Sequence, residues 1–242
     1  MSIISKLPFW GRKSVKPVYP QDEIVTRSGE KVVITFFKHA SLAFEYRGLH
    51  IYIDPVAQWA KYEQLPKADV VVVTHSHYDH FDLNAIVKLM KSETVVVCDK
   101  VSAASFDFNC VTMLPGATSK PVEGVQIDAV PAYNTTEGHL DFHPKNRDDC
   151  GYVITLGGSR FYVAGDTENN DDVKSVKDID VAFLPVNQPY TMTVDQAVDA
   201  VKAIKPQIFY PYHYGEVEEK TDTDRLVREL EGVTEVRIRP ME

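Results

Sequence analysis

The sequence predicts an α/β protein in which two β-sheets pack together and helices cover their outer sides. Two observations predict it. Short β-branched and aromatic runs are separated by turn residues, and two continuous apolar runs, at 70–73 and 181–186, are typical of strands buried on both faces. Segments with helical apolar spacing lie between the strands. A chain of 242 residues is long enough to bury such a core.

The chain divides into an N-terminal segment and one domain. Residues 1–30 are rich in proline, lysine and polar residues without a period, and we interpret them as a surface arm ahead of a single domain at 31–242. β-branched and aromatic runs indicate the strands of the first half, which are expected at 31–40, 41–48, 49–55, 68–74, 94–99, 111–116 and 125–134. Arg47-Gly48 is typical of a hairpin turn, and apolar spacing predicts a helix at 81–91.

The pattern recurs after a polar, irregular segment at 135–150, which we expect to be a long loop. The strands of the second half are expected at 151–167 (a hairpin that turns at Gly157-Gly158), 178–187, 207–216 and 233–240. Thr193 followed by Gln196 is a capping-box signature, so a helix should begin there and end before Pro206. A last helix is expected at 223–232.

Two stretches of the chain resemble each other at a nearly constant offset. A hairpin ends in Asp54 and a buried strand opens at Asp69, while a second hairpin ends in Asp166 and a second buried strand opens at Asp180. The offsets are 112 and 111 positions. They suggest a duplicated unit and two similar halves that face each other, with chance similarity as the alternative.

Composition and charge argue against several classes of protein. With 44% hydrophobic and 25% charged residues, the chain is unlike disordered, collagen-like or membrane proteins. A net charge of −9 repels phosphate backbones, so neither nucleic acid nor an anionic membrane is expected as a partner. Three cysteines cannot all pair and the N-terminus lacks a signal-peptide pattern, so we expect buried thiols and a cytoplasmic location.

Three of the eight histidines lie within residues 75–80, which read His-Ser-His-Tyr-Asp-His. Because side chains alternate along an extended strand, His75 and His77 point the same way, and the following turn brings Asp79 and His80 to the same sheet edge. Imidazole and carboxylate groups that converge in this way can hold one or two divalent cations. The pattern therefore predicts a metal site, and a surface histidine cluster is the alternative.

At these residues the sequence resembles the metallo-β-lactamase superfamily, whose signature is HxHxDH, and within it the L-ascorbate-6-phosphate lactonase-like branch of metal-dependent hydrolases. The supporting motifs run from His39 to Tyr214: KHASLAFEYRG with IDP, the HxHxDH cluster, AYN followed by HPK, AGDT, and YPYHYGE. The resemblance implies a four-layer αββα sandwich of two mixed β-sheets with two divalent metal ions at one edge. Zinc suits the imidazole-rich set, while manganese or iron would suit the carboxylates.

The resemblance also implies which residues bind the metals. The first two histidines of the cluster would bind the first metal, and Asp79 and His80 the second. Asp166, in AGDT, matches the aspartate that bridges both metals, and His213, in YPYHYGE, matches the last histidine on the second metal. Both are also metal-capable side chains at the end of an apolar strand.

The sequence leaves the remaining ligand of the first metal open. Many superfamily members have a histidine at the strand end where this chain has Asn134. Two histidines follow in the loop. We interpret His143, in its HPK context, as the ligand, with His139 or no protein residue as the alternatives. Asn134 is interpreted as a substrate contact.

Two further residues are expected close to the metals. His39 matches the histidine–alanine motif of the branch, and we interpret it as a residue that contacts substrate or supports a ligand, with a packed core histidine as the alternative. Asp54, followed by Pro55, matches a buried aspartate that orients the HxHxDH loop. Such outer partners hold metal ligands in position.

Two cations that share a water lower its pKa toward neutrality and polarise the bond under attack. The sequence therefore predicts a metal-dependent hydrolase that uses a metal-bridged hydroxide on an ester, lactone or phosphodiester bond of a small-molecule substrate. Asp79 would hold the second metal and the water and could pass a proton to the leaving group. No loop motif defines the substrate, although Lys145 and Arg147 could bind a phosphate.

Other functions share parts of this pattern. A di-iron oxygen or nitric-oxide reductase of the same fold would have glutamate in place of His77. An RNA or nucleotide phosphodiesterase would need a basic surface or a clamping arm, which the net charge of −9 does not favour. A non-catalytic metal-binding module is the remaining alternative, and the presence of the cluster together with Asp166 and His213 argues against it.

Overall fold

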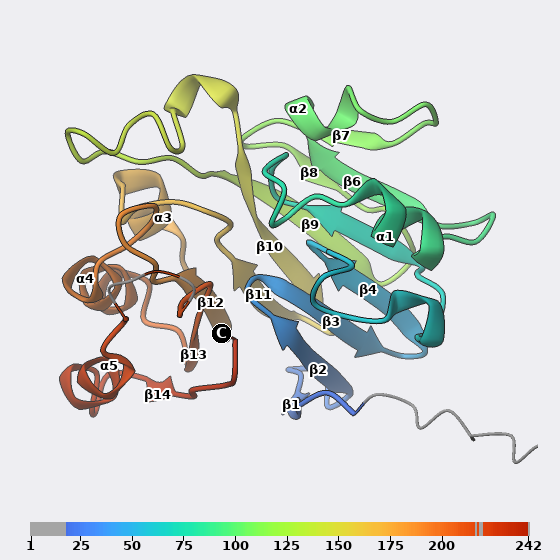
Figure 1. The fold of residues 1–242 in the computed structure, drawn as a ribbon. Coiled ribbons are helices and arrows are strands. Elements are labelled where there is room, and N and C mark those ends of the chain that lie inside the picture. The colour runs from blue at the N-terminus through green and yellow to red at the C-terminus, as the bar shows by residue number, and fades with distance from the viewer. Residues whose placement is uncertain (1–17, 216, 218–219, 242) are drawn as a thin grey trace, which may run out of the picture.

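Two seven-stranded β-sheets pack face to face, and helices cover the outer side of each sheet (Figure 1). The computed structural model describes residues 18–215, 217 and 220–241. The architecture confirms the predicted α/β fold with two mixed sheets and outer helices.

Each sheet contains the strands of one half of the chain. The first sheet consists, in spatial order, of β1 (Gln21–Val25), β2 (Lys31–Lys38), β3 (Ser41–Tyr46), β4 (Leu49–Ile53), β5 (Val70–Val73), β6 (Val95–Asp99) and β7 (Val111–Met113). The second consists, in the order of the chain, of β8 (Thr118–Ser119), β9 (Val125–Pro131), β10 (Cys150–Leu156), β11 (Ser159–Val163), β12 (Val181–Pro185), β13 (Ile208–Tyr212) and β14 (Glu235–Val236).

The two halves share one topology. In each sheet the first four strands pair antiparallel, and the last three are added in parallel. Asp69 accepts a hydrogen bond from the backbone N–H of His50 at 2.8 Å, and Asp180 accepts one from that of Arg160 at 2.8 Å. The repeated aspartate therefore ties the buried strand to the preceding hairpin in both halves, as the duplicated pattern suggested.

Helices flank both sheets. The first sheet is covered by η1 (Tyr62–Gln64), α1 (Leu83–Leu89) and α2 (Lys100–Ala103), and the second by α3 (Asp171–Ser175), α4 (Val194–Ile204) and α5 (Thr223–Glu229). A single turn, η2 (Lys145–Arg147), interrupts the long loop. The predicted capping box is present at the start of α4. The Thr193 hydroxyl accepts a hydrogen bond from the Gln196 N–H, and the Gln196 side-chain oxygen accepts one from the Thr193 N–H.

The four valines of β5 show why this strand is apolar throughout. Val70 and Val72 belong to the core between the two sheets, while Val71 and Val73 pack beneath α1 in the outer core. A strand buried on both faces needs apolar side chains at every position. Its polar continuation after Val73 therefore marks the place where the chain leaves the core.

The structure corrects three expectations. The surface arm is wrong for residues 21–25, which form β1 and pair with β2. Only Ile24 of this edge strand is fully buried, so its sequence lacks a clear alternation. The part of the arm at 1–17 lies outside the described residues. The last strand is limited to 235–236, and α2 and α3 are too short to show helical periodicity in the sequence.

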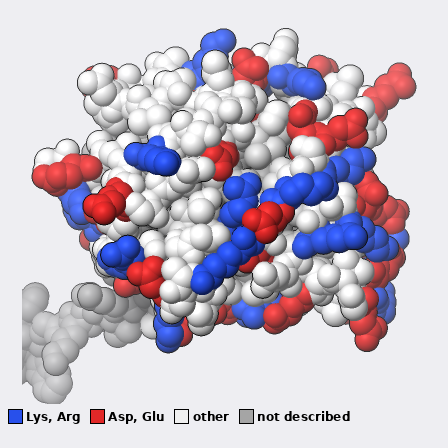
Figure 2. All heavy atoms as spheres, turned by 180° about the vertical axis from the view of Figure 1, so that it is seen from behind, with Lys and Arg blue, Asp and Glu red and all other residues white. Residues whose placement is uncertain are grey.

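None of the helices in the described part of the chain is long and apolar enough to cross a membrane. On the face seen in Figure 2, Lys and Arg side chains are interspersed with Asp and Glu side chains. Acidic and basic side chains therefore occur together on this face. Elsewhere in the structure, Arg239 lies 2.6 Å from a carboxylate oxygen of Asp22.

Candidate metal centre

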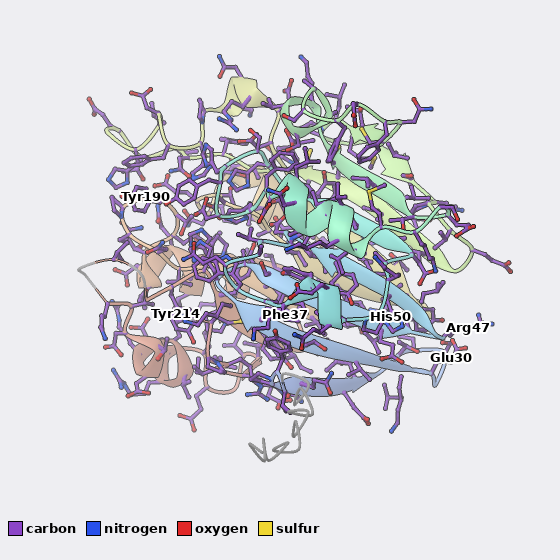
Figure 3. All side chains as sticks on the ribbon, turned by 45° about the vertical axis from the view of Figure 1, so that its right-hand side comes forward. Glu30, Phe37, Arg47, His50, Tyr190 and Tyr214 are labelled. Atoms are coloured by element: carbon purple, nitrogen blue, oxygen red, sulfur yellow. The ribbon has the colours of Figure 1, made fainter. Side chains whose placement is uncertain are left out.

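Predicted metal-binding side chains and His39, which was predicted to lie near the metals, meet at one edge of the sandwich, beyond the C-terminal ends of strands. His39 follows β2, the 75–80 cluster follows β5, Asp166 follows β11 and His213 follows β13. Loops at this edge of an α/β sheet bring side chains from distant parts of the chain together. In Figure 3, Tyr190 marks this end of the molecule, far from the labelled Glu30 and Arg47 at the other end.

One group of donor atoms comes from the cluster and the long loop. The ring nitrogens of His75, His77 and His143 lie within 4.8 Å of one another. His75 Nε2 is 3.1 Å from His77 Nδ1. His75 and His143 are buried and His77 is partly exposed, so the group faces the surface through His77.

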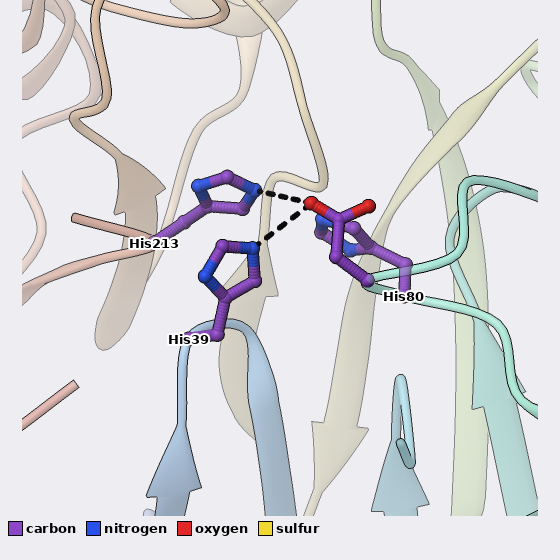
Figure 4. Close-up of side chains that lie close together, drawn as sticks. His39, His80 and His213 are labelled. Carbon is purple, nitrogen blue, oxygen red and sulfur yellow. Dashed lines mark hydrogen bonds and ion pairs between the residues drawn. The ribbon is translucent and has the colours of Figure 1, made fainter. Parts of the chain in front are cut away.

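A second group lies beside the first and contains His39, Asp79, His80 and His213. Asp79 Oδ2 is 3.0 Å from His39 Nε2 and 3.6 Å from His213 Nε2 (Figure 4). His39 comes from the turn after β2 and His213 from the end of β13, so the group joins the two sheets. The backbone reinforces this junction, because the N–H of His213 donates to the carbonyl of His39 at 3.0 Å.

Asp166 lies between the two groups. Its Oδ1 is 3.2 Å from His80 Nε2, and its Oδ2 is 3.2 Å from His213 Nε2. Oδ2 is also 3.4 Å from His143 Nε2 and 3.9 Å from His75 Nε2. One buried carboxylate therefore faces ring nitrogens of both groups, which is the arrangement expected of a bridging ligand.

The buried polar atoms at this centre fit a metal ion. His80 Nε2, His213 Nε2 and Asp166 Oδ1 are buried, and although the two rings lie 3.2 Å from the Asp166 carboxylate, none of the three atoms makes a hydrogen bond of normal geometry among the described residues. Buried polar atoms in folded proteins are normally satisfied. Imidazole nitrogens and carboxylate oxygens are ligands for zinc, manganese and iron, so cations held between the two groups would satisfy all three atoms.

Asp54 holds residues beside the metal centre in position through buried polar contacts. Its side chain is completely buried and accepts hydrogen bonds from the Thr74 N–H at 2.8 Å and the Thr74 hydroxyl at 2.7 Å. It also lies 2.8 Å from His80 Nδ1. A carboxylate at Nδ1 holds the proton there and leaves the Nε2 lone pair free to bind a cation. This geometry agrees with the orienting position expected for Asp54.

Comparison with known proteins identifies the family. A family model described as the β-lactamase superfamily domain matches residues 33–213. The chain belongs to the metallo-β-lactamase superfamily. It is 32% identical over 195 residues to a UPF0173 metal-dependent hydrolase from Pyrococcus furiosus, across 76% of this chain and 84% of that protein.

Solved structures agree with this assignment. A protein from Parabacteroides distasonis, described as a metal-dependent hydrolase, is 42% identical with a TM-score of 0.87, across 93% of this chain and 100% of that one. Igni18, a metallo hydrolase from Ignicoccus hospitalis, is 26% identical with a TM-score of 0.73, across 86% and 94% of the two chains. The chain is thus a member of the UPF0173 metal-dependent hydrolase family within the metallo-β-lactamase superfamily.

Burial and the nearby carboxylates shift the pKa values of the buried histidines in opposite directions. Burial lowers the pKa of His39 and that of His143 to about 4 in the metal-free protein. Burial alone would also lower the pKa of His213, but the Asp166 carboxylate raises it to about 9. His39 and His143 are therefore neutral at pH 7, so His143 is ready to bind a metal, whereas His213 must first release a proton.

Strained backbone accompanies the centre. His39, Asp54 and His213 have φ values of 56°, 44° and 52°, in the left-handed region that favours glycine. Such conformations cost about 1–3 kcal/mol each and are concentrated at functional sites. The sharp turns place the three side chains at the sheet edge instead of along the strands.

Two sequence-predicted residues lie elsewhere. The Asn134 amide donates to the carbonyls of Tyr190 at 2.8 Å and His139 at 3.1 Å, and the side chain does not line the cleft described below. The Asn134 amide therefore joins two loops, and its contact with substrate stays a prediction. His139 Nδ1 is 3.5 Å from a Glu168 carboxylate oxygen, outside both donor groups.

A cleft of about 560 Å³ opens above the metal centre of this superfamily member. Its walls include Trp59, Phe142, Asn187 and Tyr190, which sequence analysis missed. Asn187 could have been predicted from the sequence, because it follows the buried strand β12 as Asp166 follows β11. Its amide lies 3.1 Å from His213 Nδ1 and so orients that ring. The aromatic residues stand in irregular segments and carried no such signal.

Proposed function

We propose that this protein hydrolyses an ester, lactone or phosphodiester bond of a small-molecule substrate with two divalent metal ions, most simply zinc. The observation that carries the proposal is the position of Asp166, whose two carboxylate oxygens face ring nitrogens of both donor groups at 3.2–3.9 Å. A bridging carboxylate between two donor groups is the arrangement that holds two cations a few ångströms apart.

The donor groups supply a ligand set for each metal. The first metal would be held by His75, His77, His143 and Asp166, and the second by Asp79, His80, His213 and Asp166. When bound, two such cations supply a water of lowered pKa and polarise the bond under attack.

Asp79 is the side chain best placed to transfer a proton. It lines the cleft, and its side chain keeps 20% exposure while His39 holds one of its oxygens at 3.0 Å. Burial would raise its pKa, but the His213 and His39 rings hold it well below the usual range. Asp79 therefore remains a carboxylate at neutral pH, and although so low a pKa makes it a weak base, we propose that it relays a proton to the leaving group. His39 orients Asp79 in this arrangement.

Metal content is the first test. Full-length protein purified without a histidine tag should contain about two equivalents of zinc, manganese or iron by elemental analysis. Asp166→Asn should hold one equivalent or fewer, because it removes a charge shared by both metals. A wild-type protein that binds no metal after reconstitution would refute the proposal.

The long loop offers a matched pair of variants. His143→Gln should weaken the first site by about tenfold or more, while His139→Gln should leave metal affinity unchanged. Competition with a chelating dye measures both. Equal losses in the two variants would show that the loop, and not the His143 ring, supports the site.

Activity is tested separately on panels of esters, lactones and phosphodiesters. Turnover that disappears in Asp79→Asn while both metals stay bound would support the proton-transfer role. Protein that holds two metals yet cleaves no member of any panel would favour the non-catalytic metal-binding alternative.

A further inference from the structure

We propose that the cleft selects substrates with an uncharged, flat apolar group beside the bond that is cleaved, and that it disfavours a phosphate or other anion in that place. This inference rests on the proposed hydrolase function and adds its substrate class. It depends on the cleft walls and on the positions of the nearby cations.

One wall of the cleft is the indole of Trp59. It stacks on the His39 ring with centroids 5.3 Å apart and an interplanar angle of 19°. Because His39 touches Asp79, this wall stands beside the second donor group. A substrate whose reacting bond lies at the metals would place its neighbouring group against the indole. Aromatic surfaces favour flat, apolar partners.

The other wall is built by Phe142 and Tyr190. Their rings meet edge to face at 4.8 Å with an interplanar angle of 70°, and Tyr190 keeps 41% of its surface exposed. The Asn134 side chain donates a hydrogen bond to the Tyr190 carbonyl, which connects this wall to the segment that follows β9. Tyr78, which is 85% exposed, adds a further aromatic ring to the lining.

The charges around the cleft disfavour an anion beyond the metals. The described residues that line the cleft include no lysine or arginine. Apart from Asp166 and the members of the two donor groups, the charged side chain among them is that of Asp141. The metals could bind the reacting group of an anionic substrate. A second anion farther along the same substrate would meet aromatic rings and the Asp141 carboxylate, without a cation to replace its lost hydration.

Lys145 and Arg147, the two basic residues of the long loop that could have bound a phosphate, contact other protein groups instead. Lys145 Nζ lies 3.1 Å from the Tyr133 hydroxyl and 3.7 Å from Asp172. Arg147 pairs with Asp149 at 3.0 Å and donates to the Ser76 hydroxyl at 3.0 Å. Neither side chain lines the cleft.

Binding tests this inference without hydrolysis. The probes are two tetrahydrofurans without a cleavable ring bond, one with a phenyl substituent and one with a phosphoryloxymethyl substituent. Trp10→Phe leaves Trp59 as the single tryptophan and therefore as the fluorescence reporter. The phenyl probe should quench this fluorescence and bind at least about tenfold more tightly than the phosphate probe. Equal binding, or tighter binding of the phosphate probe, would overturn the inference.

Variants of the walls give a second measurement, by calorimetry. Trp59→Ala should weaken the phenyl probe by about twofold to tenfold, and Trp59→Phe should restore most of the loss. Asp141→Lys should improve binding of the phosphate probe by about threefold and leave the phenyl probe unchanged. Unaltered affinities in both Trp59→Ala and Asp141→Lys would contradict the assignment of the walls.

Turnover of the matching γ-butyrolactones separates this inference from the proposed function. Preferred cleavage of the phosphorylated lactone would support the hydrolase and refute the aromatic specificity. Selective binding of the phenyl probe in a protein that cleaves no panel member would support the specificity of the cleft and refute the hydrolase.

Discussion

Replacing Asp54 by asparagine tests how the fold prepares its metal centre. The asparagine carbonyl can still accept from the Thr74 N–H, but its amide group takes the place of the oxygen that faces the Thr74 hydroxyl and His80 Nδ1. An amide donor at Nδ1 requires the opposite tautomer of the ring, with the proton on Nε2. That proton occupies the nitrogen that would bind the metal.

The expected magnitude follows from these contacts. Loss of the supporting partner of a metal-binding histidine typically weakens metal affinity by about tenfold to a hundredfold. In the metal-free protein, Asp54→Asn breaks a fully buried contact at 2.8 Å and alters the one at 2.7 Å. Hydrogen bonds to charged groups contribute about 1.5–3 kcal/mol each. Since the ring can change tautomer, we expect a loss of about 2–4 kcal/mol in the free energy of unfolding.

Asp69→Asn is the matched control. Asp69 accepts from the His50 N–H at 2.8 Å and from Lys91 Nζ at 2.6 Å, and no donor group includes it. Metal affinity is measured by competition with a chelating dye, and stability by urea denaturation in the presence of EDTA. The control should lose stability but keep its metal affinity. If Asp54→Asn binds metal as tightly as the unaltered protein, the tautomer argument is wrong.

Three further predictions concern stability. The pKa of His213 is raised from 6.5 to about 9, so its protonated form contributes stability near pH 6.5 that is lost at higher pH. The pKa of His39 is lowered from 6.5 to about 4, so the folded state resists its protonation and is destabilised relative to the unfolded chain as the pH falls below 6.5. The metal-free protein should lose on the order of 1–3 kcal/mol as pH rises from 6.5 to 9, and should also lose stability as pH falls toward 4. Urea denaturation across this range checks both directions, and a flat profile would contradict them. Gly151→Ala should cost about 1–3 kcal/mol in the same assay, because a Cβ there would lie 2.4 Å from the Ala164 carbonyl oxygen. Glu168→Ala should cost about 2–3 kcal/mol and weaken the first metal site, because the carboxylate accepts two backbone N–H groups of the 135–143 loop at 2.7 Å each; dye competition that shows full affinity would refute this.

The sequence predicted most of the regular structure because burial in this fold produces local patterns. The all-valine strand β5 is apolar because both its faces are covered, and α4 shows its capping box and buried stripe. The edge strand β1 escaped prediction for the opposite reason, since a strand with one fully buried residue has no strong pattern. Short helices such as α3 complete too few turns to reveal a period.

The candidate site was predictable where the chemistry resides in single residue types. A histidine or aspartate at the end of an apolar strand is unusual wherever it occurs, so the 75–80 cluster, Asp166 and His213 could be found from the chain alone. The hydrogen bonds of Asn134 could not be predicted in the same way, because its amide donates to two backbone carbonyls of two loops. Whether an amide faces a cavity or a loop depends on segments far away in the chain.

The sequence by itself thus determined the two-sheet α/β fold, its repeated halves and the residue types able to hold metals, because periodicity and donor chemistry are local properties. Only the tertiary structure decided which donors share a group, that His143 and not His139 lies among them, and which aromatic rings line the cleft. Trp59, Phe142 and Tyr190 stand in irregular segments far apart in the chain. Their proximity results from the packing of two sheets against each other, which no local spacing records.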